Sequence, residues 1–351
     1  MAADILIAKT DLRDARLVEV APPPLADGEV RLAISRFALT ANNVTYAAMG
    51  EQFLYWRFFP APDGLGRGPV WGFADVVESR CAGVEVGARV FGFLPMSSHL
   101  VVAPVRVTPA GFIDGAAHRR ELPPVYNSYE FKPGLDARQE ALTALIRPLF
   151  TTSFLIDDHL AELDFHGAGQ VLFASASSKT ALGAAWLMRR RGGVEVVGLT
   201  SAKNVAFTQA TGAYDRVIAY EAIDAEPVRP SVLVDMAGAA AIVRAVHTHF
   251  GASLKHSMVV GATHWDAART PERPPGIAPV LFFAPDHIVK RTREWGPAVF
   301  QERVAAAQAA FIEAATWLAI EEAHGADATI AAWRDLVDGK TAPEAGLIRS
   351  L

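Results

Sequence analysis

Residues 171–204 constrain the fold more than any other part of the chain. A short apolar run at 171–174 is followed by a polar turn, and then by apolar residues at helical spacing as far as Arg191. A second apolar run occupies residues 194–199. This order predicts a strand, a tight turn, a helix and a second strand, which is the βαβ unit of a dinucleotide-binding fold.

The length and composition set limits on the rest of the chain. A length of 351 residues favours two domains over one. The formal net charge is −5 and there is no long basic run, so we expect no nucleic-acid partner. No uninterrupted apolar stretch is long enough to span a membrane, and no signal peptide is recognisable, so we expect a cytoplasmic protein. The single cysteine, Cys81, excludes an internal disulfide and a zinc site built from several cysteines.

The chain falls into a β-rich part and an alternating part. Short runs separated by glycine and proline occupy residues 1–125 and predict a small, barrel-like antiparallel domain. Farther along, predicted strands alternate with helices, which indicates a doubly wound parallel sheet of α/β class. We expect a substrate domain at residues 1–150, completed by residues 325–351, and a Rossmann-like domain at residues 151–324.

Individual elements follow from the same patterns. We expect helices at 137–147, 151–163, 180–191, 205–210 and 239–249, one long helix at 297–324, a helix at 328–336 and a tail at 339–351. We expect a half-buried strand at 29–37, and strands of the parallel sheet at 171–174, 194–199, 216–220, 231–236, 257–260 and 280–284.

The turn after the first strand of the βαβ unit lacks the usual glycines. In their place it carries polar side chains: Ser175, Ser177, Ser178, Lys179 and Thr180. Backbone N–H groups at a helix N-terminus, with these hydroxyls and the lysine, can hold a phosphate. The alternative is that Ser177 and Ser178 cap a helix in an ordinary α/β domain.

The end of the second strand indicates which dinucleotide would bind. An NAD site places an acid there for the ribose 2′-hydroxyl, whereas this chain has Thr200, Ser201 and Lys203. Hydroxyls and a lysine suit a 2′-phosphate, which an acid would repel. The sequence therefore favours NADP(H), the alternative being a surface helix with a solvated Lys203.

With these motifs, the chain resembles the medium-chain dehydrogenase/reductase superfamily on its zinc-free, quinone-oxidoreductase-like side, close to a subfamily defined by a domain of unknown function. The resemblance covers residues 41–50, 72–102, the nucleotide unit and residues 339–351. It implies a GroES-like N-terminal domain beside the Rossmann domain. It further implies a cofactor site that includes Thr200, Ser201, Lys203 and Tyr220 at the 2′-phosphate, and Gly261, Ala262 and Thr263 at the nicotinamide. Ala237 and Gly238, which follow the fourth strand, are also expected to bind the cofactor.

The zinc-binding branch of that superfamily needs ligands that this chain lacks, and its histidines show no metal spacing, so we expect no metal. Without a metal, the group that accepts a hydride needs another aid, and a phenol can deliver a proton to it. Tyr46 is the first candidate because, by resemblance, it borders the nicotinamide, and Asn43 is a second polar contact. Tyr126 and Tyr129 are alternatives. Aromatic side chains, Tyr55, Trp56, Phe59 and Tyr126, would line an apolar pocket; the alternative for residues 53–59 is a flap or a dimer contact.

These expectations combine into one function and two alternatives. The chain is expected to be an NADPH-dependent, metal-independent reductase that transfers hydride to an activated C=C of a medium-sized apolar substrate bearing a carbonyl. The first alternative is reduction of a ketone or aldehyde. The second is a non-catalytic NADPH-binding sensor or interaction module. A homodimer is left open.

Overall fold

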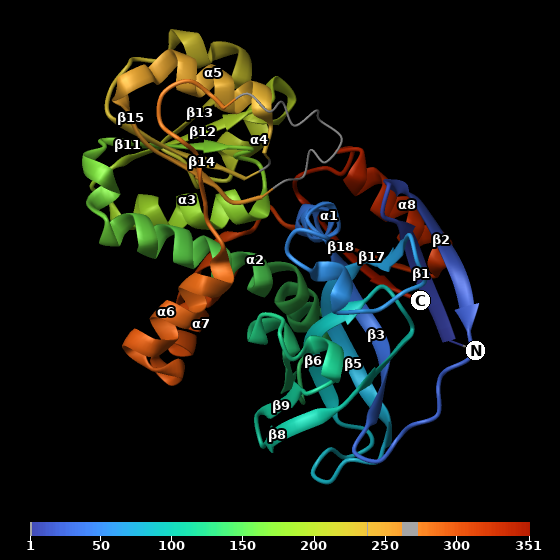
Figure 1. Ribbon diagram of the computed structural model, residues 1–351. Coiled ribbons are helices and arrows are strands. Elements are labelled where there is room, and N and C mark those ends of the chain that lie inside the picture. Colours follow the sequence, from blue (N-terminus) through green and yellow to red (C-terminus); the bar gives the residue numbers. More distant parts are fainter. Residues whose placement is uncertain (1, 237, 262–272) are drawn as a thin grey trace. The chain divides into compact units, whose positions relative to one another are not determined.

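The computed structural model describes residues 2–236, 238–261 and 273–351, and it separates the chain into two compact units (Figure 1). Unit 1 comprises residues 1–145 and 318–351, and unit 2 comprises residues 146–317. The boundaries expected from the sequence, after residues 150 and 324, lie a few residues farther along the chain. No helix in the described part of the chain is long and apolar enough to cross a membrane.

Unit 1 is built mainly on antiparallel strands. Its larger sheet has the order β17-β18-β3-β5-β6-β10-β9-β8, with β7 paired to β3, and its smaller sheet has the order β2-β1-β4. The strands are β1 (Ala2–Ala8), β2 (Asp11–Val20), β3 (Val30–Leu39), β4 (Leu65–Arg67), β5 (Pro69–Ser79), β6 (Arg89–Pro95), β7 (His99–Val102), β8 (Pro104–Thr108), β9 (Gly111–Asp114), β10 (Ser128–Phe131), β17 (Ala319–His324) and β18 (Ala345–Ser350). The helices are α1 (Ala41–Ala48) and α8 (Ala326–Val337), with the short 3-10 segments η1 (Tyr55–Arg57), η2 (Ala117–Arg119) and η3 (Pro124–Asn127).

Unit 2 is a doubly wound parallel sheet, as the alternating pattern predicts. Its strand order is β13-β12-β11-β14-β15-β16, which is the order 3-2-1-4-5-6 of a dinucleotide-binding fold. The strands are β11 (Gln170–Ala174), β12 (Glu195–Thr200), β13 (Arg216–Ala219), β14 (Ser231–Asp235), β15 (Leu254–Val259) and β16 (Val280–Leu281). The helices are α3 (Lys179–Arg191), α4 (Val205–Ala210), α5 (Ala240–Phe250), α6 (Ala284–Trp295) and α7 (Pro297–Ala314), with η4 (Asp164–Gly167), η5 (Ala202–Asn204), η6 (Tyr220–Ala225) and η7 (Gly251–Ser253) between them; α2 (Ala137–Glu162) has residues in both units.

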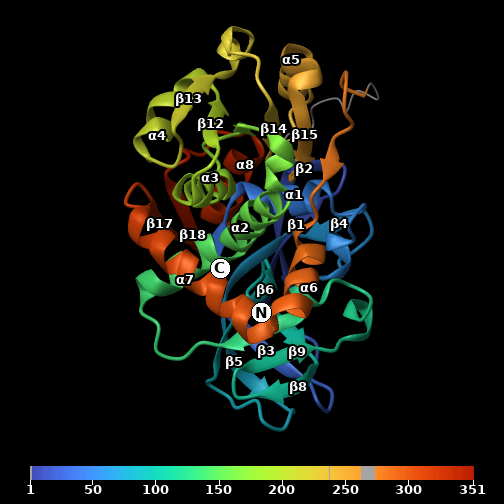
Figure 2. The same ribbon diagram turned by 90° about the vertical axis from the view of Figure 1, so that its left-hand side faces the viewer.

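Helices cover both faces of the parallel sheet, with α3 on one face and α5 on the other (Figures 1 and 2). Val243, Val246 and Phe250 of α5 pack on Leu172 and Leu233 of the central strands. These strands are buried along their whole length, which explains their continuous apolar runs. The predicted βαβ unit is therefore confirmed.

Helix α3 begins and ends where local chemistry requires. The Ser178 Oγ accepts a hydrogen bond from the Ala181 N–H at 3.3 Å and caps the first turn. Gly192, with φ of 72°, follows the last turn, where three arginines face the negative end of the helix dipole.

The expected single helix at 297–324 is wrong. Helix α7 ends at Ala314, and residues 319–324 form β17, which pairs in parallel with β18. Hydrogen bonds to a distant strand overrule the local helical pattern here, and the expected tail at 339–351 contains that strand. The helices expected at 137–147 and 151–163 form one helix, α2, with Pro148 inside it. Most of the run at 280–284 is not strand, and α6 begins at Ala284.

Gly183 allows two helices of unit 2 to approach closely. A Cβ at this position would lie 2.7 Å from the Ser153 Oγ and 3.2 Å from the Phe150 Cδ2, both on α2. The Ser153 Oγ also lies 2.7 Å from the Thr180 carbonyl oxygen of α3, so it is held in place. Glycine is thus required for contact between α3 and α2.

Gly183→Ala should destabilise unit 2 by about 1–3 kcal/mol, because the added methyl group overfills a packed contact. Urea unfolding followed by circular dichroism measures the loss. Gly169→Ala is the matched control, since a Cβ there meets no atom of the described residues within 4 Å, and the stability of this variant should stay near that of the parent. Equal stability of the two variants would contradict the packing argument.

Candidate functional site

The carboxyl ends of the central parallel strands lie level with one another in unit 2. Ala174, which ends β11, pairs with Leu199 of β12 and with Asp235, which ends β14. Strand order reverses between β11 and β14, and ligands of open α/β sheets bind outside the carboxyl ends at such a point. The residues that follow these strands therefore form the candidate cofactor site.

The turn after β11 is held by side chains from the end of β12 and from the segments that follow β12 and β13. Ser175 has a left-handed φ of 58°, and its N–H donates to the Tyr220 Oη at 3.0 Å. The Ser177 Oγ accepts from the Asn204 Nδ2 at 3.2 Å, and the Thr200 Oγ1 lies 3.5 Å from it. The structure thus brings together hydroxyls that the sequence places up to 45 residues apart.

The end of β12 offers hydroxyl and ammonium groups. Thr200 is buried, Ser201 is half-buried and Lys203 is exposed on η5. Within the described ranges Lys203 has no ion-pair partner, and residues 200–204 contain no acid. This donor set fits a phosphate group carried on a ribose.

Burial raises the pKa of Tyr220, and the hydrogen bond from Ser175 acts against that rise. Tyr220 therefore keeps its phenolic proton at neutral pH, and this proton remains available to donate while the oxygen accepts from Ser175.

The structure does not describe three of the predicted cofactor residues: Ala237, Ala262 and Thr263. Gly261 is half-buried just after β15. The Gly238 N–H donates to the Asp235 carboxylate at 3.1 Å. Asp235 itself was not anticipated, although an acid as the last residue of a buried strand is a signal that points to this edge of the sheet.

In unit 1, three of the predicted tyrosines meet in one aromatic cluster. The cluster consists of Tyr46, Tyr55, Phe58, Phe59, Phe93, Leu122 and Tyr126, all buried. The rings of Tyr46 and Tyr55 lie 4.6 Å apart, and those of Tyr46 and Tyr126 lie 6.0 Å apart. The Tyr55 and Tyr126 hydroxyls are hydrogen-bonded at 3.1 Å.

Tyr46 has a hydrogen-bond donor of its own. The Trp71 Nε1–H of β5 donates to the Tyr46 Oη at 3.2 Å. Burial raises the pKa of Tyr46, while hydrogen bonds from Trp71, and then from Asn42 and Tyr126, oppose the rise. Burial also raises the pKa of Tyr126, and the nearby Tyr46 hydroxyl adds to this effect.

Asn43 and Tyr129 hold backbone groups. The Asn43 Oδ1 accepts from the Thr40 N–H at 2.7 Å at the start of α1, and its Nδ2 donates to the Pro69 carbonyl oxygen at 2.8 Å. The Tyr129 hydroxyl donates to the Phe93 carbonyl oxygen at 2.8 Å, and burial raises its pKa to about 12. The polar groups of Asn43 and Tyr129 are therefore already hydrogen-bonded to backbone groups of unit 1.

Trp56 and Phe59, expected to line a pocket, fill the interior of unit 1. The Trp56 ring packs against Gly50 and Gly66, where a Cβ would come within 2.2 and 2.3 Å of the ring atoms. Phe59 packs on Phe93 with ring centroids 5.6 Å apart.

A buried ion pair fixes the loop that carries these aromatic residues. The Arg119 guanidinium lies 3.1 Å from the Asp114 carboxylate, and both side chains are almost fully buried. The same guanidinium donates to the Phe58 carbonyl oxygen at 3.2 Å and to the Tyr129 hydroxyl at 3.2 Å. Arg119 therefore connects β9 and β10 with the aromatic run at 53–59.

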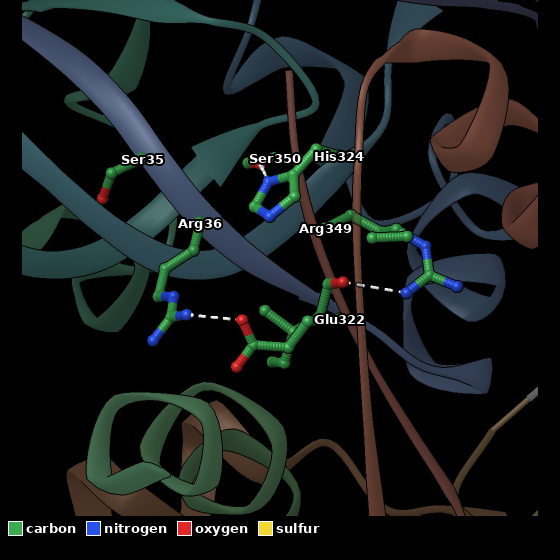
Figure 3. A pocket seen from close by; sticks show the side chains of 8 residues that line it. Ser35, Arg36, Glu322, His324, Arg349 and Ser350 are labelled. Atoms are coloured by element: carbon green, nitrogen blue, oxygen red, sulfur yellow. Dashed lines mark hydrogen bonds and ion pairs between the residues drawn. The ribbon is translucent and has the colours of Figure 1, made fainter. Parts of the chain in front are cut away.

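Figure 3 shows a pocket elsewhere in unit 1, bounded by β3, β17 and β18. Arg36 donates to the Glu322 carboxylate at 2.8 Å, and His324 is hydrogen-bonded to Ser350. This pocket has a volume of about 40 Å³, which admits a few water molecules, and none of the site residues predicted from the sequence lines it. It is therefore too small for the expected substrate.

Four histidines of unit 2 form two ring pairs. The His159 and His287 centroids lie 4.6 Å apart, and His166 stacks on His256 at 4.2 Å. The described residues contain no group of three or more metal-ligating side chains arranged to hold an ion. Burial, and then the neighbouring imidazole, lowers the pKa of His159 and of His256 to about 4.

Acidification should therefore destabilise unit 2. As the pH falls from about 6.5 to about 4, these imidazoles bind protons in the unfolded chain but stay neutral in the folded protein. The free energy of unfolding therefore falls as the pH is lowered across this window. Urea unfolding at several pH values measures the slope. His256→Phe keeps a ring on His166 and should show a shallower slope; an unchanged slope would remove His256 from the explanation.

Comparison with known proteins places this fold. The family model "Protein of unknown function (DUF2855)" matches residues 37–342, which is most of the chain. No curated protein matches the chain. CurA from Vibrio vulnificus in complex with NADPH has a TM-score of 0.63 at 14% identity, covering 99% of this chain and 98% of that chain.

Two further solved structures share the fold. Mycobacterial Rv1454c complexed with NADPH has a TM-score of 0.61 at 14% identity, covering 99% of each chain. JamJ enoyl reductase has a TM-score of 0.63 at 14% identity, covering 100% of each chain. At this identity the likeness is one of fold. The expected pair of a β-rich unit and a Rossmann unit is confirmed, and so is the expected closeness to a subfamily defined by a domain of unknown function.

Proposed function

We propose that this chain, which belongs to the DUF2855 family, is an NADPH-dependent reductase that acts on an activated carbon–carbon double bond. The observation that carries the proposal is the acid-free end of β12, where Lys203 stands without an ion-pair partner among the described residues, beside a hydroxyl-rich turn. Similarly folded structures that are complexed with NADPH, and one that is an enoyl reductase, support it.

The proposed cofactor contacts divide between two strand ends. After β11, polar groups and the N-terminus of α3 hold the diphosphate: Ser175, Ser177, Ser178, Lys179 and Thr180. After β12 and β13, Thr200, Ser201, Lys203 and Tyr220 hold the 2′-phosphate. Gly261 belongs to the segment proposed to face the nicotinamide. No metal is required in this proposal.

When bound, NADPH supplies a hydride, with its two electrons, to the carbon of the double bond that is β to the substrate carbonyl. Tyr46 then gives the proton of its Oη–H to the α-carbon, which leaves a phenolate that water reprotonates. Since burial raises the pKa of Tyr46, the phenol stays protonated and ready at neutral pH. The aromatic side chains around Tyr46 favour a medium-sized apolar substrate.

Lys203→Ala should weaken NADPH binding by about tenfold to a hundredfold, because a charge-assisted hydrogen bond worth roughly 1.5–3 kcal/mol is lost. NADH affinity should not change, since NADH has no 2′-phosphate. Isothermal titration of both cofactors measures the difference.

Lys255→Ala is the control for this titration, because Lys255 is also an exposed lysine of unit 2 and, within the part of the chain that the structure describes, donates to the Ala252 carbonyl oxygen. It should bind NADPH as the parent does. Equal affinity of the parent for NADPH and NADH would overturn the cofactor assignment.

Tyr46→Phe should lower kcat about a hundredfold or more, because a positioned general acid contributes at least that factor. NADPH oxidation at 340 nm, followed over a panel of enones, quinones and aldehydes, gives the rates. NADPH affinity should be retained, which separates loss of chemistry from loss of folding. Full turnover by the variant would remove Tyr46 from the mechanism.

Rates over the same panel of enones, quinones and aldehydes distinguish the proposed function from its alternatives. Faster turnover of enones than of aldehydes is expected. Tight NADPH binding without oxidation by any substrate would instead indicate a binding module.

A further inference from the structure

We infer that Trp71 is a positioning residue for proton donation by Tyr46: its indole N–H fixes the direction of the phenolic proton and stabilises the phenolate. This inference rests on the proposed function and extends it to a residue that does not itself react. The carrying observation is the 3.2 Å hydrogen bond from the Trp71 Nε1 to the Tyr46 Oη.

The direction of this hydrogen bond is fixed by chemistry. An indole N–H donates and cannot accept, so the Tyr46 oxygen is the acceptor. The Tyr46 proton must then point away from Trp71. A hydroxyl that already accepts one bond from a fixed donor has fewer orientations left for its own proton, which organises it for transfer.

The other two tyrosines of the cluster cannot replace Tyr46 equally well. The Tyr55 and Tyr126 hydroxyls are bonded to each other at 3.1 Å, so one of their two protons is already used between them. Tyr46 instead has the indole donor, and hydrogen bonds from Asn42 and Tyr126 also favour its ionised form. Of the three, the Tyr46 phenolate is therefore the best stabilised after proton loss.

Trp71 is itself held in place by aromatic contacts within unit 1. Its ring stacks on Phe91 at 5.7 Å and lies 5.2 Å from Phe93, while Phe93 meets the Tyr46 ring edge-on at 5.3 Å. Both partners of the hydrogen bond thus pack on Phe93. Fixed rings on each side of the bond reduce the entropy that is lost when the phenolate forms.

Trp71→Phe removes the donor and keeps an aromatic ring. We expect kcat to fall about tenfold to a hundredfold, because that is the rate factor equivalent to the stabilisation by one hydrogen bond to a charged group. We expect little change in KM. The basic limb of the kcat–pH profile should move to higher pH, because loss of the donor raises the pKa of Tyr46. A role in packing alone would not move this limb.

The Tyr46→Phe background provides the control. In that background Trp71→Phe should have almost no further effect on the residual rate, because the two groups act through one bond. An equal loss in both backgrounds would overturn the inference, as would a kcat and pH profile of Trp71→Phe identical to those of the parent.

A measurement that needs no turnover and no change at Trp71 completes the test. In ¹⁵N-tryptophan-labelled protein, the Trp71 indole N–H resonance should shift upfield in Tyr46→Phe, since its acceptor is gone. An unmoved resonance would show that the hydrogen bond is absent and overturn the inference. Absence of turnover in the parent over the whole panel would instead sink the proposed function, and the proton-donation role of Tyr46 with it.

Discussion

Parallel pairing of β11 with β12 on one side and β14 on the other is the constraint on which the candidate cofactor site depends. This register brings three strand ends level, and the segments that follow β12 and β13 then reach the turn at Ser175. The Ser175 N–H meets the Tyr220 hydroxyl, and the Ser177 Oγ meets Asn204. A turn without the usual glycines is thereby held by hydrogen bonds to the segments η5 and η6, and its left-handed Ser175 costs about 1–2 kcal/mol that these bonds offset.

Unit 1 relies on a different interaction, the buried pair of Arg119 and Asp114. Removing one partner of such a pair leaves an uncompensated charge, so the pair is a strong constraint on conformation even where its net stabilisation is small. It fixes the Phe58 backbone, and Phe58 in turn packs edge-on with Phe93 at 5.3 Å. Phe93 also contacts Tyr46, so the proposed proton donor is oriented through packing that begins at a charged pair.

The sequence was sufficient for the central strands of the parallel sheet because β11, β12 and β14 are buried and mostly apolar. The prediction from the sequence failed at Ala319–His324, a polar strand whose partner, β18, lies more than twenty residues farther along the chain. The candidate cofactor residues after β12 could be identified from residue type alone. The bond between Trp71 and Tyr46 could not, because it joins positions 25 residues apart on a strand and a helix, and only the tertiary fold brings them together.

The central claim is that hydride reaches a carbon–carbon double bond from NADPH. Turnover of an enone with NADPH deuterated at C4 on the transferred side, followed by mass spectrometry and NMR of the product, tests it most directly. One deuterium at the β-carbon, with the carbonyl retained, is the predicted result. Deuterium on the carbonyl carbon of an alcohol product, or no deuterium in any product, would contradict it.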